Sequence, residues 1–245
     1  MSATFAHTIN PNVSVDNVIL GFDENELKVL LIERQRDDSG MDDFLALPGD
    51  LIYEDEPLDE AANRVLHELT GLKNIFLEQF YTFGDPNRIS KKQDQDWLKK
   101  IRAHPEARVI TVAYYTLVKI ENYKPTASGF ASNAIWVPVN QVPQLAFDHN
   151  LIFDRAIDHL KHKLYRHPIG FELLPKKFTL AQLQRLYEII LQTKLDKRNF
   201  RRKILKTEFV IPLDEKQKGV AHKPAMLYKF DKQKFDSVDL DFPVF

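Results

Sequence analysis

The stretch from Gly49 to Leu72 constrains the fold of this chain of 245 residues more than any other. Its second half predicts an α-helix, because apolar residues recur there every three or four positions and therefore share one face. The members of this face are Leu58, Ala61, Ala62, Val65 and Leu69. Gly71 follows the last of them and is a typical helix stop. The first half, up to Glu56, is predicted to be a loop.

The same stretch resembles the Nudix box, G-x5-E-x7-R-E-U-x-E-E-x-G-U, in which U is a bulky aliphatic residue. Leu47-Pro48-Gly49 precedes it as in that family. Three positions differ: Asp50 replaces the first Gly, and Val65 and Leu69 each replace a Glu. The alternative is an ordinary amphipathic surface helix with this spacing, but periodicity alone predicts only a helix. The positions that agree with the pattern are Glu56, Arg64, Leu66, Glu68, Gly71 and Leu72.

Two of the replacements remove carboxylates that a Nudix hydrolase uses. In those enzymes the helix glutamates hold Mg²⁺ against a diphosphate, and Mg²⁺ needs nearly octahedral oxygen ligation, which Val65 and Leu69 cannot supply. Glu68 alone, even with Glu54 or Glu56, is a poor metal cage. We therefore expect no catalytic residue, no bound metal and no cofactor. Restoring Glu at positions 65 and 69 is expected to raise the affinity for Mg²⁺. The degenerate box consists of Asp50, Glu56, Arg64 and Glu68.

The composition indicates a protein with sizeable hydrophobic cores and a divided charge. Hydrophobic residues make up 44% of the chain and charged residues 28%, and the absence of cysteine excludes disulfides and thiolate chemistry. No apolar run approaches the roughly 18 residues of a membrane span, and the N-terminus has no signal pattern, so we expect a cytoplasmic protein without a membrane partner. Residues 1–170 carry 18 Lys and Arg against 25 Asp and Glu, whereas residues 171–235 carry 16 against 7. This division indicates a polyanionic partner for the basic end.

The order of elements predicts two domains. Strands are expected over residues 13–22, 27–34, 75–83, 108–118 and 134–139, and Asp148 is expected to begin a further helix. With the box helix they form one α/β Nudix-like domain, a mixed sheet between helices. We interpret residues 84–107 as an insertion, either a short helix or a mobile excursion, with no chemistry that indicates a site. A boundary at His167-Pro168-Ile169-Gly170 gives a Nudix-like effector-sensing domain over 1–168 and a second domain over 169–245.

The second domain has the element order of a winged helix-turn-helix, an α+β fold. Thr179 can cap a first helix and Asp196 a second one over 197–206, in which Phe200 and Ile204 point inward. Two strands, over 208–211 and 225–230, flank a basic loop. A helix with an exposed basic face fits the major groove of DNA, where Arg reads guanine, Asn reads adenine and neighbouring Lys residues hold phosphates.

This layout predicts a surface for double-stranded operator DNA. The candidate contacts from the two helices are Thr179, Lys197, Arg198, Asn199, Arg201, Arg202 and Lys203. The candidate contacts from the hairpin loop, which is expected to follow the DNA backbone or the minor groove, are Lys216, Lys218, His222 and Lys223. A charge run is often only a solvated face, and Asn199 could read a base, bind a phosphate or bond within its turn.

A degenerate Nudix box followed by a winged helix resembles the Nudix-related transcriptional regulators, and segments 64–72, 178–184 and 195–201 carry the resemblance. It implies a homodimeric repressor whose former catalytic domain binds a small molecule: a pentose in AraR-type members and ADP-ribose in NrtR-type members. We interpret the chain as a ligand-responsive repressor of sugar utilisation genes of the arabinose type. The alternatives are an NrtR-type regulator that senses ADP-ribose, an active ADP-ribose pyrophosphatase with ligands from outside the box, and a protein-binding adaptor.

The effector is expected in the former substrate cleft. Each candidate residue has a plain alternative, as a packing residue or as the partner of a nearby surface charge. Asp50 argues slightly against a diphosphate effector, because it places an anion near the expected position of that group. The candidate effector-binding residues are Arg34, Glu78, Tyr81, Phe83, Asp85, Arg88 and Arg108.

Overall fold

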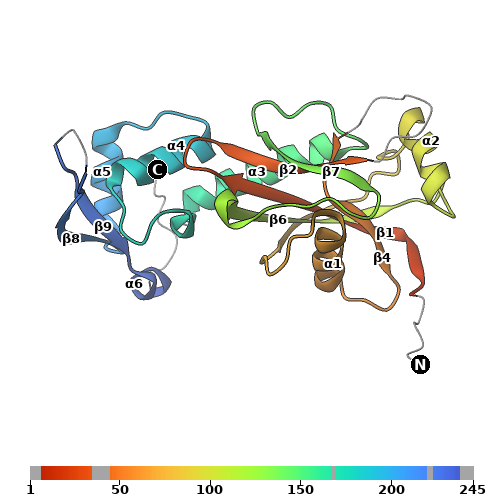
Figure 1. Ribbon diagram of the computed structural model, residues 1–245, viewed down its shortest axis with the longest axis horizontal. Coiled ribbons are helices and arrows are strands. Elements are labelled where there is room, and N and C mark those ends of the chain that lie inside the picture. Colours follow the sequence, from red (N-terminus) through yellow and green to blue (C-terminus); the bar gives the residue numbers. More distant parts are fainter. Residues whose placement is uncertain (1–6, 35–44, 167–168, 220–222, 238–245) are drawn as a thin grey trace. The chain divides into compact units, whose positions relative to one another are not determined.

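The computed structural model describes residues 7–34, 45–166, 169–219 and 223–237, which form two compact units (Figure 1). The first unit comprises Met1–Asp23 and Leu27–Ala156, and the second comprises Glu24–Glu26 and Ile157–Phe245. The division falls inside helix α3 (His149–Arg166), which therefore contributes to both units. The boundary between residues 168 and 169 stays a prediction. No helix in the described ranges is long and apolar enough to cross a membrane.

Over the described residues, the first unit is built on a mixed seven-stranded sheet. The strands are hydrogen-bonded in the order β3-β2-β1-β6-β5, while β4 also pairs with β1 and β7 also pairs with β2. The β1–β6 pair is parallel and the other pairs are antiparallel. This confirms the predicted mixed sheet. The strands are β1 (Ile9–Phe22), β2 (Leu27–Arg34), β3 (Leu45–Ala46), β4 (Gly49–Tyr53), β5 (Glu78–Phe83), β6 (Ile110–Lys119) and β7 (Ala131–Pro138).

The start of the box is a strand and not the predicted loop. Gly49, Asp50 and Leu51 of β4 pair with the N-terminal half of β1, Gly49 directly opposite Asp16. A Cβ atom at Gly49 would lie 1.7 Å from Oδ1 of Asp16, so only glycine permits this close approach of the two strands. The Asp16 side chain that sets this requirement lies far from the box in the sequence, which is why the motif alone did not predict a strand.

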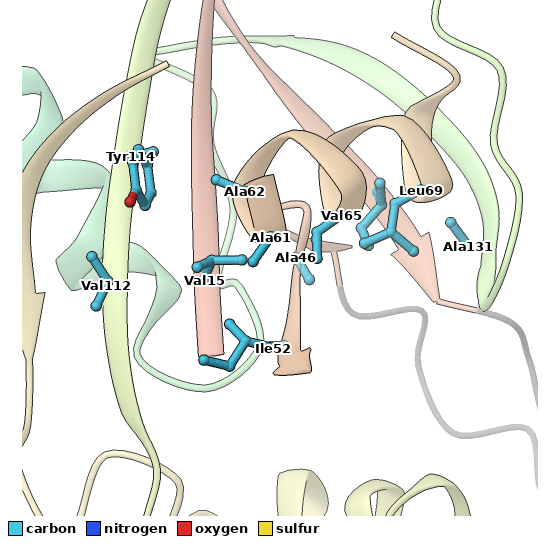
Figure 2. Close-up of a cluster of buried hydrophobic side chains, with 12 residues drawn as sticks. Val15, Ala46, Ile52, Ala61, Ala62, Val65, Leu69, Val112, Tyr114 and Ala131 are labelled. Atoms are coloured by element: carbon cyan, nitrogen blue, oxygen red, sulfur yellow. The ribbon is translucent and has the colours of Figure 1, made fainter. Parts of the chain in front are cut away.

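The box helix α1 (Leu58–Thr70) has the predicted limits and the predicted buried face. It ends at Gly71, which has a left-handed φ of 69° and donates its backbone N–H to the carbonyl of His67 over 2.8 Å. Its apolar side chains join a core with residues of β1, β3, β4 and β6 (Figure 2). The buried amide of Asn17 on β1 donates to the carbonyl of Ala62 over 3.0 Å and fastens the helix to the sheet.

Residues 84–107, interpreted from the sequence as an insertion with either a short helix or a mobile excursion, contain a helix that packs into the first unit. They contain helix α2 (Lys92–Ile101), in which Asp94 and Leu98 are fully buried. The carboxylate of Asp94 accepts the backbone N–H of Phe147 over 3.0 Å. The ring of Trp97 packs edge-on against the rings of Phe130 and Phe147. The segment is polar in sequence partly because two of its buried residues, Arg88 and Asp94, are charged and find their partners only in the folded chain.

Arg88 ties this segment to the sheet. Its Nε and Nη2 donate to the two carboxylate oxygens of Asp148 over 2.9 and 2.8 Å, and its Nη1 donates to the hydroxyl of Thr111 on β6. Nη2 also lies 3.7 Å from Oδ2 of Asp16. The Arg88 side chain is only 4% exposed. One guanidinium therefore holds together β1, β6 and the start of α3, and its removal would leave two buried carboxylates uncompensated.

We predict that Arg88→Ala lowers the free energy of unfolding of the first unit by about 3–5 kcal/mol, since breaking a buried ion pair strands its partner. The matched control is Arg108→Ala, because Arg108 is exposed and donates only to the carbonyl of Gly84; its effect should stay within about 0.5 kcal/mol. Urea unfolding followed by tryptophan fluorescence measures both, because the two tryptophans, Trp97 and Trp136, lie in the first unit. Equal effects of the two substitutions would contradict the assignment.

The second unit is a winged helix-turn-helix, as predicted. Phe178 forms an isolated bridge to Tyr228 and adds a short third strand to the β8–β9 hairpin. Strand β8 begins at Val210, two residues later than predicted, because Glu208 adopts a left-handed φ of 61° that a strand excludes. The elements are η2 (Phe171–Leu173), α4 (Leu180–Leu191), α5 (Lys197–Lys206), β8 (Val210–Lys216), β9 (Met226–Phe230) and α6 (Lys232–Ser237).

Two apolar clusters hold these elements. Tyr187 of α4 packs edge-on against Phe200 of α5, with ring centroids 5.9 Å apart, which fixes α5 against α4. The hairpin is held to η2 and α6 by phenylalanines, among which the rings of Phe171 and Phe230 are stacked at 4.2 Å. The α6 helix and the η2 turn have no counterpart among the elements that the sequence predicted. The phenylalanines of the second cluster are Phe171, Phe178, Phe209, Phe230 and Phe235.

Candidate effector site and DNA-binding surface

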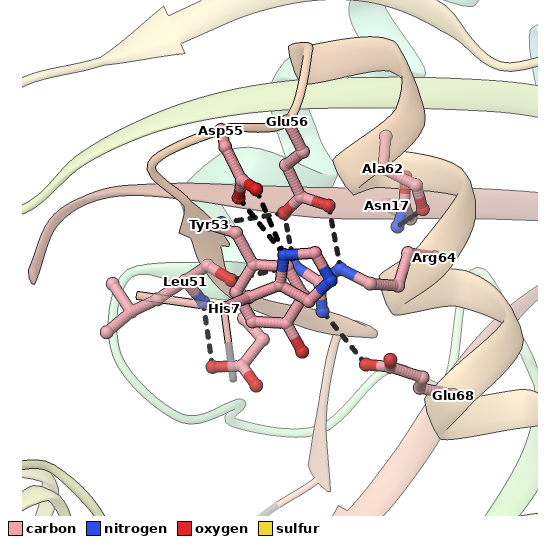
Figure 3. A network of polar contacts seen from close by, with 10 residues as sticks. His7, Asn17, Leu51, Tyr53, Asp55, Glu56, Ala62, Arg64 and Glu68 are labelled. Atoms are coloured by element: carbon pink, nitrogen blue, oxygen red, sulfur yellow. Dashed lines mark hydrogen bonds and ion pairs between the residues drawn. The ribbon is translucent and has the colours of Figure 1, made fainter. Parts of the chain in front are cut away.

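The surviving ion pair of the box fastens the β4–α1 turn to its helix. Arg64 donates through Nε and Nη2 to the carboxylate of Glu56 over 2.9 and 2.5 Å, and through Nη1 to Glu68 over 2.9 Å (Figure 3). Its Nη2 also donates to the carbonyl of Leu51 over 3.1 Å, and its guanidinium lies 3.9 Å from the ring centroid of Tyr53. Through these contacts the N–H groups of Arg64 are bound within the protein itself.

The Glu56 carboxylate is held in its charged form. Burial raises the pKa of Glu56, but the hydrogen bond from Arg64, the backbone N–H of Tyr53 at 2.7 Å and the charge of Arg64 outweigh burial and bring the pKa below its usual value. Two of the box residues that agree with the Nudix pattern, Glu56 and Arg64, are therefore structural partners of one another.

The helix face that carries metal ligands in a Nudix hydrolase does not fit Mg²⁺ in this chain. Val65 is fully buried and Leu69 is 3% exposed, and both point into the core beside Ala46 and Ala131 (Figure 2). The one carboxylate left on this face, that of Glu68, is paired with Arg64. Within the described ranges, no three His, Cys, Asp or Glu side chains are grouped so that they could hold a metal ion.

The structure changes the expected result of restoring the glutamates. We predict that Val65→Glu lowers the free energy of unfolding by about 3 kcal/mol or more, because an unpaired carboxylate would be buried among apolar side chains. Asn63→Glu adds the same group at an exposed position of the same helix and serves as the control, with little loss. Thermal unfolding of both variants measures this. A Val65→Glu variant as stable as the control, with raised Mg²⁺ affinity, would restore the expectation drawn from the sequence.

Asp50, which replaces the box glycine, is influenced by nearby charges of both signs. Its Oδ1 accepts the backbone N–H of Leu51 over 2.7 Å. Burial raises the pKa of Asp50; the Leu51 N–H and the charges of Arg102 and Arg64 lower it, and the charge of Glu68 raises it further. The charges that act on Asp50 are therefore those of Arg64 and Glu68 on the box helix and that of Arg102, which follows α2.

Two of the predicted effector residues, Arg34 and Arg88, are buried in the interior of the first unit. Arg34 lies 3.8 Å from the Asp94 carboxylate, and its guanidinium is 4.5 Å from the ring centroid of Trp97 and 5.3 Å from that of Phe147. Arg34 therefore takes its partners from the segment 84–107 and from the residues before α3, and Arg88 takes its partners from β1, β6 and the start of α3. Any contact that they make with an effector has to compete with these partners.

The other predicted effector residues have local partners. Phe83 is buried, whereas Tyr81 is 50% exposed with the guanidinium of Arg155 5.8 Å from its ring centroid. Glu78 accepts the hydroxyl of Tyr115 over 3.3 Å. Asp85 is exposed and caps its own turn by accepting the N–H of Asn87, and Arg108 is also exposed. Their role in effector binding remains a proposal.

The fold places near Arg88 further polar side chains that the sequence did not mark as site residues, namely Asp16, Arg102, Asp148 and His149. Burial lowers the pKa of His149 to about 3, so the ring is neutral; its Nδ1 accepts the backbone N–H of Leu47 over 2.9 Å, which places the proton on Nε2, 3.6 Å from Asp16. Burial also raises the pKa of Asp16, against the opposing charge of Arg88. The sequence signal that indicates this cluster is the charged Asp16 within a strand that is rich in apolar residues.

The second helix of the winged unit, α5, presents its cations as predicted. The side chain of Asp196 accepts the backbone N–H of Asn199 over 2.7 Å and caps the helix, while Phe200 and Ile204 are buried. Lys203 is half-buried. Asn199 accepts a hydrogen bond from Arg202 over 2.8 Å, which is the bond within the turn among its three alternatives. The exposed members of the predicted set are Lys197, Arg198, Asn199, Arg201 and Arg202.

The remaining predicted DNA contacts are Thr179 and the residues of the hairpin loop. Thr179 is 3% exposed, and its hydroxyl bonds to Gln182 in a complete capping box at the start of α4, so a capping role replaces the expected DNA contact. Lys216, Lys218 and Lys223 are exposed around the hairpin tip. His222 lies outside the described residues.

Comparisons with known proteins agree with this architecture. A model of the NUDIX domain matches residues 11–159, and a model of the NrtR DNA-binding winged helix domain matches residues 170–230. The chain is 31% identical over 231 residues to the ADPR responsive transcriptional repressor NtrR of Acinetobacter baylyi, over 93% of this chain and 85% of that protein. It is 27% identical over 144 residues to an ADP-ribose pyrophosphatase of Methanocaldococcus jannaschii, over 59% of this chain and 72% of the relative.

A solved structure covers both units. The crystal structure of Shewanella oneidensis NrtR complexed with a 27mer DNA has a TM-score of 0.64 at 26% identity, over 91% of this chain and 95% of that chain. Since one family model spans more than half of the chain and a curated relative aligns with nearly all of it, the chain belongs to the NrtR-type Nudix-related transcriptional regulators, in which a winged helix domain follows a Nudix domain.

Proposed function

We propose that this protein is an ADP-ribose responsive transcriptional repressor that binds operator DNA as a homodimer. The observation that carries the proposal is the exposed basic face of α5, on a helix held by the Asp196 cap and by two buried side chains. Two relatives support the proposal: the Acinetobacter baylyi protein is named as an ADPR responsive transcriptional repressor, and the Shewanella oneidensis protein was crystallised with DNA. In this proposal residues 1–168 sense the effector and residues 169–245 bind DNA.

ADP-ribose replaces the pentose in this proposal. The curated relative that aligns with 93% of this chain is named for its response to ADPR, and a second relative, aligned with the Nudix part, is named for acting on ADP-ribose. The metal-ligand face of α1 is filled with apolar side chains, so we propose binding of the effector without hydrolysis. An arabinose-type sugar response has no comparable support.

The proposed mechanism couples two binding equilibria. Two winged helices of a dimer have to match the spacing of two half-sites on the operator. An effector that favours another spacing weakens DNA binding, and DNA weakens effector binding by the same factor, typically about 5–150-fold for a coupling of about 1–3 kcal/mol. Salt-dependent contacts with phosphates from the cations of α5 and of the hairpin tip would provide most of the affinity for DNA.

We predict that the double variant Arg198→Ala, Arg201→Ala binds operator DNA at least about 30-fold more weakly, because each base or phosphate contact is worth about 1–3 kcal/mol. The operator is a duplex selected by the wild-type protein from a randomised pool, and affinity is measured by fluorescence anisotropy. The slope of log affinity against log salt should fall by about 2. The control, Lys73→Ala with Lys124→Ala, removes the same charge from exposed positions of the first unit. Unchanged affinity of the α5 variant would refute the assignment of the recognition helix.

We predict further that ADP-ribose, added without metal, releases the wild-type protein from this duplex, whereas arabinose, xylose and ribose leave the complex intact. The same anisotropy assay measures release, and a thermal-shift assay of the free protein checks binding, because a ligand that binds only the native state raises its melting temperature. Release by a pentose alone would support the arabinose-type alternative. Rapid, Mg²⁺-dependent production of AMP from ADP-ribose would support an active hydrolase.

A further inference from the structure

The helix α5 has one side that faces away from the core of the winged unit. The buried side chains of Phe200 and Ile204 mark its inward side. Successive residues of an α-helix are turned by about 100°, so Arg202, midway between these two in the sequence, points about 180° away from them. Asn199 and Leu205 lie on the two flanks of this outward side, each about 120° from the buried direction. A recognition helix presents its outward side to the base edges of the major groove.

Arg202 is held in place on this outward side. Its Nη2 donates to Oδ1 of Asn199 over 2.8 Å, one helical turn nearer the N-terminus. The backbone of Asn199 is fixed in turn, because its N–H donates to the carboxylate of Asp196 over 2.7 Å. The bond to Asn199 occupies one of the five N–H donors of a guanidinium and leaves the others for a ligand. A long side chain that is already held loses less conformational entropy on binding than a free one.

The same bond indicates what Asn199 does. To read adenine, an asparagine accepts a hydrogen bond from N6 with its side-chain oxygen and donates one to N7 with its side-chain nitrogen. In this helix the oxygen is bonded to Arg202 instead. Asn199 is therefore suited to position Arg202, whose planar guanidinium matches the O6 and N7 acceptors of guanine.

Leu205 adds an apolar group beside these polar ones. In the described part of the second unit, the large apolar side chains that are exposed are those of Leu205, at 43%, and Met226. Leu205 follows Arg202 by three residues, a rise of about 4.5 Å, which compares with about 3.4 Å between successive base pairs. Thymine is the base that presents an apolar group, its methyl group, in the major groove. A thymine within two base pairs of the guanine would therefore lie in reach of Leu205.

We propose that α5 distinguishes a guanine and a nearby thymine in each half-site. Arg202, positioned by Asn199, bonds to the guanine, and Leu205 covers the methyl group of the thymine. Asn199 is a positioning residue and contacts no base. This inference rests on the proposed binding of operator DNA and adds the bases that the helix selects.

The test uses the full chain and the duplex that the wild-type protein selects from a randomised pool, with affinity measured by fluorescence anisotropy. Each guanine of a half-site is replaced in turn by 7-deazaguanine, which lacks the N7 acceptor, and each thymine by deoxyuridine, which lacks the methyl group. One guanine replacement should weaken wild-type binding about 5-fold or more. One thymine replacement, within two base pairs of that guanine, should weaken it about 3-fold.

Variants assign each base to its side chain. Arg202→Ala should bind the guanine and 7-deazaguanine duplexes equally, and Leu205→Ala should no longer distinguish thymine from deoxyuridine. Asn199→Ala should lose most of the preference for guanine, whereas Asn199→Asp keeps an oxygen acceptor for Arg202 and should retain the preference. A role of Asn199 in helix stability alone would not change this ratio. The control, Leu151→Ala, is the same truncation at an exposed position of the first unit and should discriminate like the wild type.

The outcomes separate this inference from the proposed function. Wild-type protein that selects no duplex would end both. Wild-type binding that no 7-deazaguanine replacement weakens, or an Arg202→Ala variant that prefers guanine as the wild type does, would overturn the inference and leave operator binding standing. Circular dichroism verifies that each variant is folded. If Arg202→Ala binds too weakly to measure, the Asn199 pair decides: a guanine preference that differs between Asn199→Ala and Asn199→Asp supports the inference, and equal preferences contradict it.

Discussion

The buried ion pair between Arg88 and Asp148 fixes the geometry on which the rest of the first unit depends. Its two hydrogen bonds, with the contact to Thr111 and the nearby carboxylate of Asp16, join three elements that are distant in the sequence. A buried charge pair contributes little net stability compared with apolar packing, but it is demanding in geometry, because every charged atom needs a partner. This demand holds the segment 84–107 in one place against β1, β6 and the start of α3.

The box helix shows how a catalytic scaffold can persist when its metal ligands are gone. Glu56 and Arg64 stabilise the turn that enters α1, and this function is independent of catalysis. Val65 and Leu69 occupy the face where carboxylates would face the metal, and they extend the hydrophobic core instead. The exchange gains apolar burial and loses the oxygen ligands that Mg²⁺ requires. The same helix therefore keeps its position although the oxygen ligands of a metal site are gone.

The winged unit exposes many like charges on a short helix, and their repulsion destabilises that helix unless other interactions hold it. Six cations in ten residues repel one another. The helix is kept by the Asp196 cap at its N-terminus, by Phe200, which packs against Tyr187 of α4, and by the buried Ile204. The cap places a negative charge at the positive end of the helix dipole. The repulsion that remains is the property that favours a polyanionic partner.

Local patterns in the sequence determined the elements of this protein. The apolar period of α1, the stop at Gly71, the cap at Asp196 and the basic run of α5 involve residues within a few positions of one another, so each was predicted from its neighbours alone. Tertiary structure decided which polar groups meet. Asp148 lies 60 residues from Arg88, and the partner that makes β4 a strand is Asp16 on β1. For the same reason Thr179, placed on the DNA surface from its sequence context, is a buried cap, and Asp94, in a segment interpreted as an insertion, is buried beside Arg34. Periodicity and capping act between residues that are one or two helical turns apart. The pairing of buried charges depends instead on which distant segments the fold brings together.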